Sequence, residues 1–162
     1  MHDVTFHAEP ERRVAAIAHT GIYQELATAF AAAGQALGAA QAFGRVNEMI
    51  AVYHDDPKTT PANKLRSHAG FVLKHGQYAP EGMDTLLLRA ARCVVLRHQG
   101  PYEGLAQSYD WLLSVWLPAS GEVRAQAPTF EIYLNTPENT APADLVTMVY
   151  LPLEEADFNG PI

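Results

Sequence analysis

The sequence contains one internal repeat, and this repeat constrains the fold more than any other feature of the chain. The segment RVAAIAHTGIYQELA, which begins at Arg13, aligns with RCVVLRHQGPYEGLA, which begins at Arg92, and six of the fifteen positions are identical. At an offset of 80 residues, four further pairs match in the same order: Tyr53 with Tyr133, Pro57 with Pro137, Thr60 with Thr140, and Leu65 with Leu145. Both matched segments occur in the same order and at nearly the same offset, which indicates a tandem duplication of about 80 residues.

Each copy contains the same succession of elements. Alternating and β-branched runs predict strands, which in the first copy are Val4 to His7, Arg13 to Ala18, Glu48 to Tyr53 and Arg66 to Leu73. The corresponding strands of the second copy are Asp84 to Leu88, Arg92 to Arg97, Thr129 to Leu134 and Val146 to Leu151. Each copy therefore follows a β-α-β-β order with an additional leading strand.

A helix is expected between the second and third strand of each copy. In the second copy an apolar stripe recurs at three- and four-residue steps, through Tyr102, Leu105, Tyr109, Leu112 and Trp116. The first copy repeats this stripe with Ile22, Leu26, Phe30, Ala33 and Leu37. Gly100 and Pro101 suit the helix start, and Pro118 is expected to help end it. Trp111 projects nearly opposite the stripe, so we expect it outside the same core. It is then covered by a loop, buried in a dimer contact, or exposed as a partner surface.

We predict an α+β fold in which a duplicated βαββ module with pseudo-twofold symmetry places its helices on one side of the sheet and leaves a concavity between the halves. Each half alone has too small a core to fold independently. Residues 1–155 are therefore expected to form one domain, with halves of about 1–80 and 81–155, and residues 156–162 to form a loose tail.

Glu131 is the candidate functional residue, because it lies in the middle of the predicted strand in APTFEIYLN. Side chains alternate along a strand, so Glu131 and Tyr133 share one face while Phe130 and Ile132 share the other. A buried carboxylate is costly unless it is compensated. Compensation is expected from a cationic ligand, from Arg66 or Arg92, or from a tyrosine hydroxyl. The first copy has Ala51 at the matching position, which favours a functional role over a solvated face.

Aromatic and thioether side chains are the expected companions of such a carboxylate, since ring faces attract cations. Tyr133 shares the face of Glu131, Tyr53 is its repeat mate, and Met49 shares the face of Tyr53. Tyr150 and Met148 share one face of the last strand and are further candidates for lining the site, although the pattern does not settle which face this is.

Charge and composition exclude several classes of function. The net charge is −7, and no cluster of Lys and Arg stands out, so direct nucleic-acid binding is not expected. The longest apolar runs are too short for a membrane span, and no secretory signal is visible. Cys93, the only cysteine, is expected to be a buried, inert thiol, and the chain is expected in the cytoplasm.

Sites for a metal ion, a cofactor or a catalytic constellation are not indicated. The seven histidines do not form a metal-binding pattern, and no common nucleotide-binding or nucleophile motif is present. His19 and His98 occupy the same repeat position, and a structural role at the strand end is expected for both.

The run VVLRHQGPYEGLAQSYDWLLSVWLP, the strand FEIYLN and the ending VTMVYLPL resemble the GyrI-like small-molecule-binding family. This family includes DNA gyrase inhibitory proteins and the effector-binding domains of MerR- and AraC-type regulators. The resemblance implies a duplicated βαββ (SHS2) module whose cleft binds hydrophobic cations. It also implies that a strand glutamate, which matches Glu131 here, neutralises the ligand.

These observations together predict a stand-alone protein, monomeric or homodimeric, that binds or sequesters hydrophobic, cationic compounds. Two alternatives remain open. The resemblance also fits an inhibitor that contacts DNA gyrase through protein–protein interactions. It further fits a hydrolase of reactive, DNA-alkylating natural products, in which Glu131 would activate water.

Overall fold

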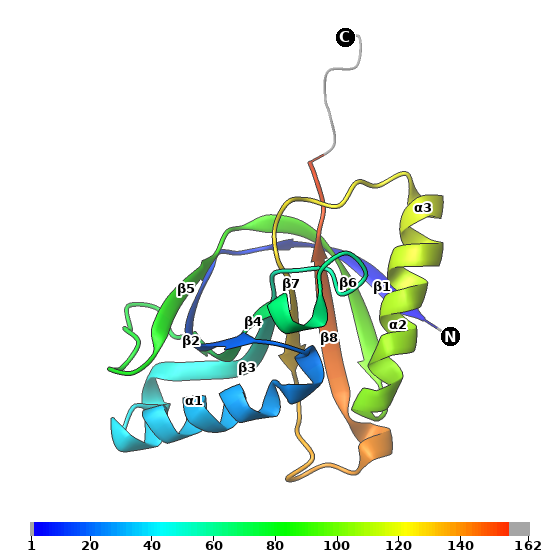
Figure 1. Cartoon of the computed structure of the whole chain (residues 1–162). Coiled ribbons are helices and arrows are strands. Elements are labelled where there is room, and N and C mark those ends of the chain that lie inside the picture. Colours follow the sequence, from blue (N-terminus) through cyan, green and yellow to red (C-terminus); the bar gives the residue numbers. More distant parts are fainter. Residues whose placement is uncertain (1, 156–162) are drawn as a thin grey trace, which may run out of the picture.

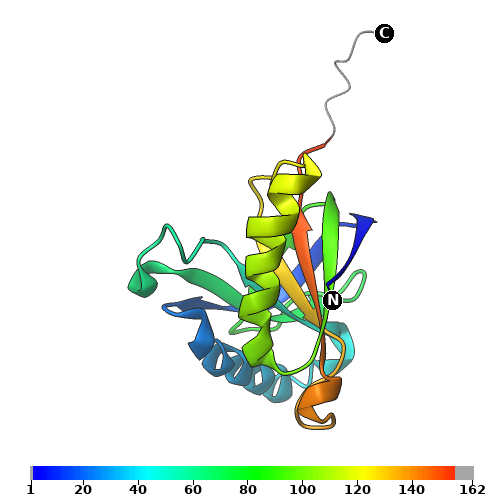
Figure 2. The ribbon, with the colours of Figure 1, turned by 90° about the vertical axis from the view of Figure 1, so that its right-hand side faces the viewer.

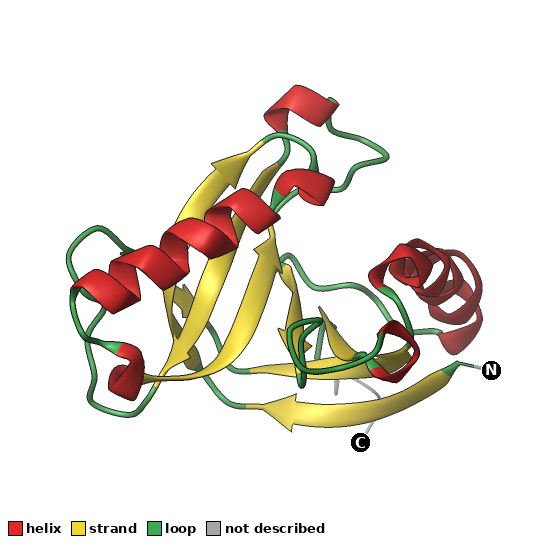
Figure 3. Ribbon diagram, turned by 90° about the horizontal axis from the view of Figure 1, so that it is seen from below, coloured by secondary structure: helices red, strands yellow, loops and turns green. Residues whose placement is uncertain are grey.

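The computed structural model describes residues 2–155, and the tail predicted at 156–162 lies outside the described residues. Within residues 2–155 eight strands form one antiparallel sheet, and the two long helical segments lie on one of its faces (Figures 1 and 3). The strands are β1 (Asp3–Glu9), β2 (Arg12–Thr20), β3 (Val46–Tyr53), β4 (Arg66–Leu73), β5 (Asp84–Leu88), β6 (Ala91–Gln99), β7 (Thr129–Tyr133) and β8 (Val146–Pro152). The α-helices are α1 (Ala27–Ala39), α2 (Leu105–Trp111) and α3 (Leu117–Ser120).

The strand order confirms the duplication and reveals an exchange between the copies. The order is β1-β6-β8-β7-β3-β4-β2-β5, so each strand of one copy has its repeat mate at the mirrored place in the sheet. The two leading strands have changed partners: β1 pairs with β6 of the second copy, and β5 pairs with β2 of the first. The halves are therefore interlocked within one sheet.

Two short connections, each from an exchanged leading strand to the strand that follows it, make the sheet curl. Only residues 10–11 join β1 to β2, and only residues 89–90 join β5 to β6, although each connection links opposite sides of the strand order. The two edges of the sheet must therefore approach each other, as the arch formed by β2, β5, β6 and β1 shows in Figure 1. The helix-free face becomes the inside of the curl, where seven strands contribute to one buried cluster.

Cys93 lies in this inner cluster and has no exposed surface. Burial raises the pKa of its thiol to about 11, so the thiol stays protonated at neutral pH. The expectation of a buried, inert thiol is confirmed. Among the described residues, no helix combines the length and the apolar character that crossing a membrane requires.

The repeated glycines make the same backbone contact in both copies. The N–H of Gly21 donates to the carbonyl of Leu65, and the N–H of Gly100 donates to that of Leu145, each at 2.8 Å. Their φ angles are +127° and +133°, a backbone region that residues other than glycine rarely adopt. These positions turn the chain from β2 towards α1 and from β6 towards α2.

The repeated histidines secure the same two turns. Nε2 of His19 lies 3.1 Å from the carbonyl oxygen of Ile22, and Nε2 of His98 lies 3.0 Å from that of Pro101. The structural role predicted for this pair at the strand ends is confirmed.

The helical segment of the second copy differs from the expectation at Pro118. This residue lies inside α3, and the helix ends at Gly121 in the left-handed conformation. A π-helical turn, Leu112–Trp116, separates α2 from α3 and shifts the hydrogen bonds, with the N–H of Leu117 reaching the carbonyl of Leu112. Pro118 is the second residue of α3, so it lies in the first turn of a new α-helical segment, where proline is tolerated, instead of ending the helix.

The expectation that Trp111 lies outside the core of the helix stripe is wrong. Trp111 packs against the same buried cluster as Tyr109 and Trp116, together with Val94 and Leu151. Its ring also stacks on that of His2 at a centroid distance of 4.4 Å. His2, just before the exchanged strand β1, therefore covers Trp111, and the N-terminus lies beside the α2–α3 helical segment (Figure 2).

Candidate functional site

Glu131 lies at the centre of the sheet, on the pseudo-twofold axis that relates the two copies. It is paired with its own repeat mate, Ala51, across β7 and β3, and with Val149 of β8 on the other side. Its exposed fraction is 3 %, on the face that the helices cover. A glutamate in both copies would place two carboxylates directly opposite each other, which explains why the duplication carries only one.

Three tyrosine hydroxyls hold the Glu131 carboxylate. Tyr53 and Tyr133 donate to Oε1 at 3.0 and 2.7 Å, and Tyr109 donates to Oε2 at 2.5 Å. The donors come from β3, β7 and α2, so both copies and one helix converge on a single side chain. Of the possible compensating groups, the structure uses tyrosine hydroxyls.

The two arginines considered as partners are engaged elsewhere. Arg66 forms an ion pair with Asp55 at 2.9 Å, and Arg92 forms one with Glu122 at 2.6 Å. The carboxylate of Glu131 is therefore held by neutral donors, and its negative charge remains uncancelled.

Burial raises the pKa of Glu131 above its ordinary value, while the three hydrogen bonds and the nearby His98 oppose the shift. Burial also raises the pKa of Tyr53, Tyr109 and Tyr133 well above the usual range, and the charge of Glu131 raises it further. All three phenols are consequently donors at neutral pH.

Further aromatic rings surround this centre in pairs related by the repeat. The rings of Tyr23 and Tyr53 lie 4.7 Å apart, and their mates Tyr102 and Tyr133 lie 5.8 Å apart. The ring of Phe30, the mate of Tyr109, meets that of Tyr133 edge-on at 5.8 Å. Rings from both copies thus frame the carboxylate.

Sequence reasoning missed four of these rings as part of the site: Tyr23, Phe30, Tyr102 and Tyr109. They were assigned only to the repeat and to the apolar helix stripes. The sequence contained a signal for them, because the apolar stripes are the helix faces expected to pack on the sheet that carries Glu131. In addition, Tyr23 and Tyr102 are identical across the copies.

The other sequence candidates divide between the two faces. Met49 pairs with Tyr133 across β3 and β7, so its side chain lies beside that ring on the face of Glu131. Tyr150 stacks on Phe130 at 4.7 Å, and Met148 packs against the same inner cluster. Because Val149 is opposite Glu131, its neighbours Met148 and Tyr150 point to the inside of the curl. These two do not join Glu131.

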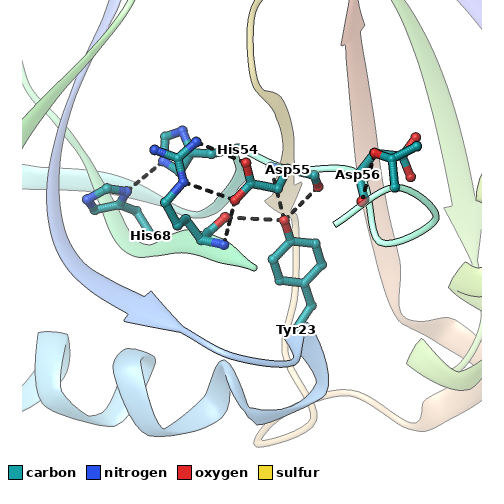
Figure 4. Close-up of polar contacts among 7 residues, drawn as sticks. Tyr23, His54, Asp55, Asp56 and His68 are labelled. Atoms are coloured by element: carbon teal, nitrogen blue, oxygen red, sulfur yellow. Dashed lines mark hydrogen bonds and ion pairs between the residues drawn. The ribbon is translucent and has the colours of Figure 1, made fainter. Parts of the chain in front are cut away.

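The aromatic frame is tied to the loop after β3 (Figure 4). The hydroxyl of Tyr23 lies 2.7 Å from the carbonyl oxygen of Asp55 and accepts from the Asp55 N–H at 3.1 Å. The Asp55 carboxylate in turn binds Arg66. Tyr23, whose ring packs on Tyr53, is therefore fixed by this polar network.

Comparison with known proteins agrees with this architecture. The family model of the GyrI-like small molecule binding domain matches residues 2–154. The chain is 32% identical over 108 residues to the "Probable transcriptional regulator YgiV" of Escherichia coli K12, which covers 66% of this chain and 68% of that protein. It is 26% identical over 112 residues to a "DNA gyrase inhibitor" of Erwinia billingiae, covering 67% and 70%.

Solved structures share the fold at low sequence identity. The C-terminal domain of EcmrR superposes with a TM-score of 0.77 at 16% identity, covering 96% of this chain and 99% of that one. A hydrolase encoded by lin2189 of Listeria innocua gives a TM-score of 0.65 at 12% identity, covering 94% and 92%. SAV2435 bound to tetraphenylphosphonium gives 0.63 at 13%, covering 95% and 94%.

These structural likenesses concern the fold alone, whereas the family model spans nearly the whole described chain. The duplicated sheet, the helices on one face and the family match lead to one conclusion. The chain belongs to the family of GyrI-like small-molecule-binding domains.

Proposed function

We propose that this protein binds hydrophobic, cationic small molecules at Glu131, in a cleft between the two copies on the helix-covered face. The observation that carries the proposal is a nearly fully buried carboxylate that three tyrosine hydroxyls hold and that, within residues 2–155, forms no ion pair with an Arg or Lys side chain. Sequestration of such compounds is the expected biological consequence.

The fold itself has no need of this carboxylate. The first copy places Ala51 at the matching position, with Leu26, Ala29 and Ala69 packed around it in an apolar cluster. Burying an ionised carboxylate costs several kcal/mol unless it is compensated. A bound cation would recover part of this cost, which gives the unmatched acid a function in ligand binding.

The surrounding rings supply the second requirement. A cation over an aromatic face gains about 0.5–2 kcal/mol from the ring quadrupole. Tyr53 and Tyr133 offer their rings beside the carboxylate, while Tyr23, Tyr102 and Met49 flank them. The Coulomb attraction of Glu131 is strong in such a low-dielectric setting. Charge selects a cation, and the rings select a bulky, apolar one.

The comparisons support the same ligand class. SAV2435, whose structure contains tetraphenylphosphonium, shares this fold. The family model describes small-molecule binding. Tetraphenylphosphonium combines a positive charge with four apolar rings and is therefore a suitable first probe.

A thermal-shift screen tests the proposal. Lipophilic cations such as tetraphenylphosphonium should raise the unfolding midpoint of the wild type by ligand linkage. A neutral compound of similar shape, triphenylphosphine oxide, should do so much less. The shift should disappear in Glu131→Gln and persist in Glu138→Gln, which removes an exposed loop carboxylate. Equal shifts with the cation and the neutral compound would overturn the proposal.

A second candidate function is inhibition of DNA gyrase through protein contact. It is favoured by the relative from Erwinia billingiae that carries the name DNA gyrase inhibitor, and by the net charge of −7, which suits a basic partner surface. A supercoiling assay with purified gyrase tests it directly. Unchanged supercoiling at a large excess of this protein would remove this candidate.

A further inference from the structure

A hydrogen bond joins the imidazole rings of His54, which directly follows β3, and His68 of β4. Nε2 of His54 lies 2.7 Å from Nδ1 of His68, and the rings meet edge-on with centroids 4.9 Å apart (Figure 4). Both side chains are half-buried. His68 alternates with Ala69 and Ser67, so it points away from the face that carries Glu131.

The duplicated scaffold does not need this pair. The turn around it is repeated: a carboxylate oxygen of Asp55 accepts from the Arg66 N–H, and the amide oxygen of Asn135 accepts from the Val146 N–H, both at 2.8 Å. At the same offset of 80 residues, His54 corresponds to Leu134 and His68 to Met148. The second copy thus builds the same turn without either imidazole.

We propose that His54 and His68 chelate a divalent transition-metal ion, Cu²⁺ or Ni²⁺, through Nε2 and Nδ1. Imidazole nitrogen is a preferred ligand of both ions, which favour coordination angles near 90°. Two bonds of about 2.0 Å at that angle place the nitrogens about 2.8 Å apart. The observed separation is 2.7 Å. Binding requires each ring to rotate until both lone pairs converge on the ion, a soft torsion for histidine.

The local charge favours a cation. Arg66 is neutralised by its bidentate contact with Asp55, and Asp84 lies close enough to His68 to act on its pKa. The three charged neighbours therefore sum to −1 (Asp55 −1, Asp84 −1, Arg66 +1). Burial lowers the pKa of both histidines, so both rings are neutral and able to coordinate at neutral pH.

Within residues 2–155 no cluster of three or more His, Cys, Asp or Glu side chains suited to a metal ion is formed. The chelate therefore has two protein ligands, with solvent in the remaining positions. An exchangeable ion of moderate affinity is expected rather than a permanent structural metal. This inference is independent of the Glu131 site.

Calorimetric titration with Cu²⁺ tests the chelate. The reference is the chain with His2→Asn, because a histidine beside the N-terminal amine binds Cu²⁺ by itself. One ion per chain is expected in this background and also with the exposed His75 changed to Asn. His54→Leu and His68→Met, which copy the residues of the second half, should each weaken binding at least ten-fold.

Pulsed electron paramagnetic resonance of the Cu²⁺-loaded reference should detect two coordinated imidazoles, and this result does not depend on how the variants fold. Circular dichroism confirms the fold of each variant. Unchanged affinity in the double variant His54→Leu/His68→Met, a single coordinated imidazole, or no binding by the reference would each overturn the proposal.

Discussion

Glu131 has a carboxylate where its repeat mate Ala51 has a methyl group, and we propose that this carboxylate serves ligand binding rather than folding. Its three phenolic partners satisfy the oxygens without cancelling the charge. Because burial is the larger effect, the pKa of Glu131 is raised in the folded protein. The folded state therefore binds this proton more tightly than the unfolded state does, and Glu131 lowers stability as pH rises through its folded pKa.

At the scale of single residues, Glu131→Gln should raise the unfolding midpoint by a few degrees at pH 7. The amide removes the buried charge at nearly constant side-chain volume. The gain should shrink towards pH 4, where the wild-type carboxyl is protonated. Differential scanning calorimetry across this range is the measurement, and Glu138→Gln is the exposed control. A lower midpoint for Glu131→Gln at pH 7 would show that the charge stabilises the fold.

Sequence reasoning about single residues succeeded where alternation decided the outcome. It placed Glu131 with Tyr133 on one strand face and Tyr53 with Met49 on another, and the register of β3 and β7 brings both pairs to the same face of the sheet. It left the face of Tyr150 and Met148 open, because the orientation of β8 relative to β7 depends on a pairing that no local pattern specifies. It also missed Tyr109, whose place on a helix stripe looked like ordinary core.

At the scale of elements, β3 and β7 pair so that the two copies of one position lie opposite each other. Ala51 has no exposed surface and lies among apolar side chains. A second carboxylate there would be buried and would face Glu131 directly. This pairing restricts the sheet to a single acid at its centre.

Ala51→Glu should therefore lower the unfolding midpoint by about 10 °C or more at pH 7, since an uncompensated buried charge costs roughly 3–5 kcal/mol. Ala51→Gln has the same size without the charge and separates crowding from electrostatics. The difference between the two variants should narrow towards pH 4. Thermal unfolding followed by circular dichroism checks this, and equal midpoints at pH 7 would refute the electrostatic explanation.

The eight strands were predictable because each has a clear alternation or a β-branched run, and their observed bounds differ from the predicted ones by at most two residues. The π-helical turn was not predictable. A helix stripe assumes 100° per residue, and the turn at Leu112–Trp116 changes this phase. The position of Pro118 was misjudged for that reason. Trp111 precedes the turn and was misjudged because the contact of its ring with His2 joins segments far apart in the sequence.

At the scale of the whole molecule, the repeat predicted two related halves but not the exchange of their leading strands. The pairing of β1 with β6 joins segments nearly 90 residues apart, and nothing local in Asp3–Glu9 specifies its partner. Once the sheet order is known, the two-residue connections from β1 to β2 and from β5 to β6 show that the two edges of the sheet must curl towards each other. The interlocked sheet then holds Glu131 rigidly at the meeting point of the copies.

We propose that the ionised carboxylate of Glu131 is the counter-charge of a bound cation. Calorimetric titration with tetraphenylphosphonium as a function of pH, in buffers of different ionisation enthalpy, tests this proposal most directly. A cation beside Glu131 lowers the pKa of that carboxyl. The affinity of the wild type should therefore rise with pH through the folded pKa of Glu131, with release of protons on binding in that range. Glu131→Gln should bind at least ten-fold more weakly and release none, whereas equal affinity and equal pH dependence in both proteins would contradict the account.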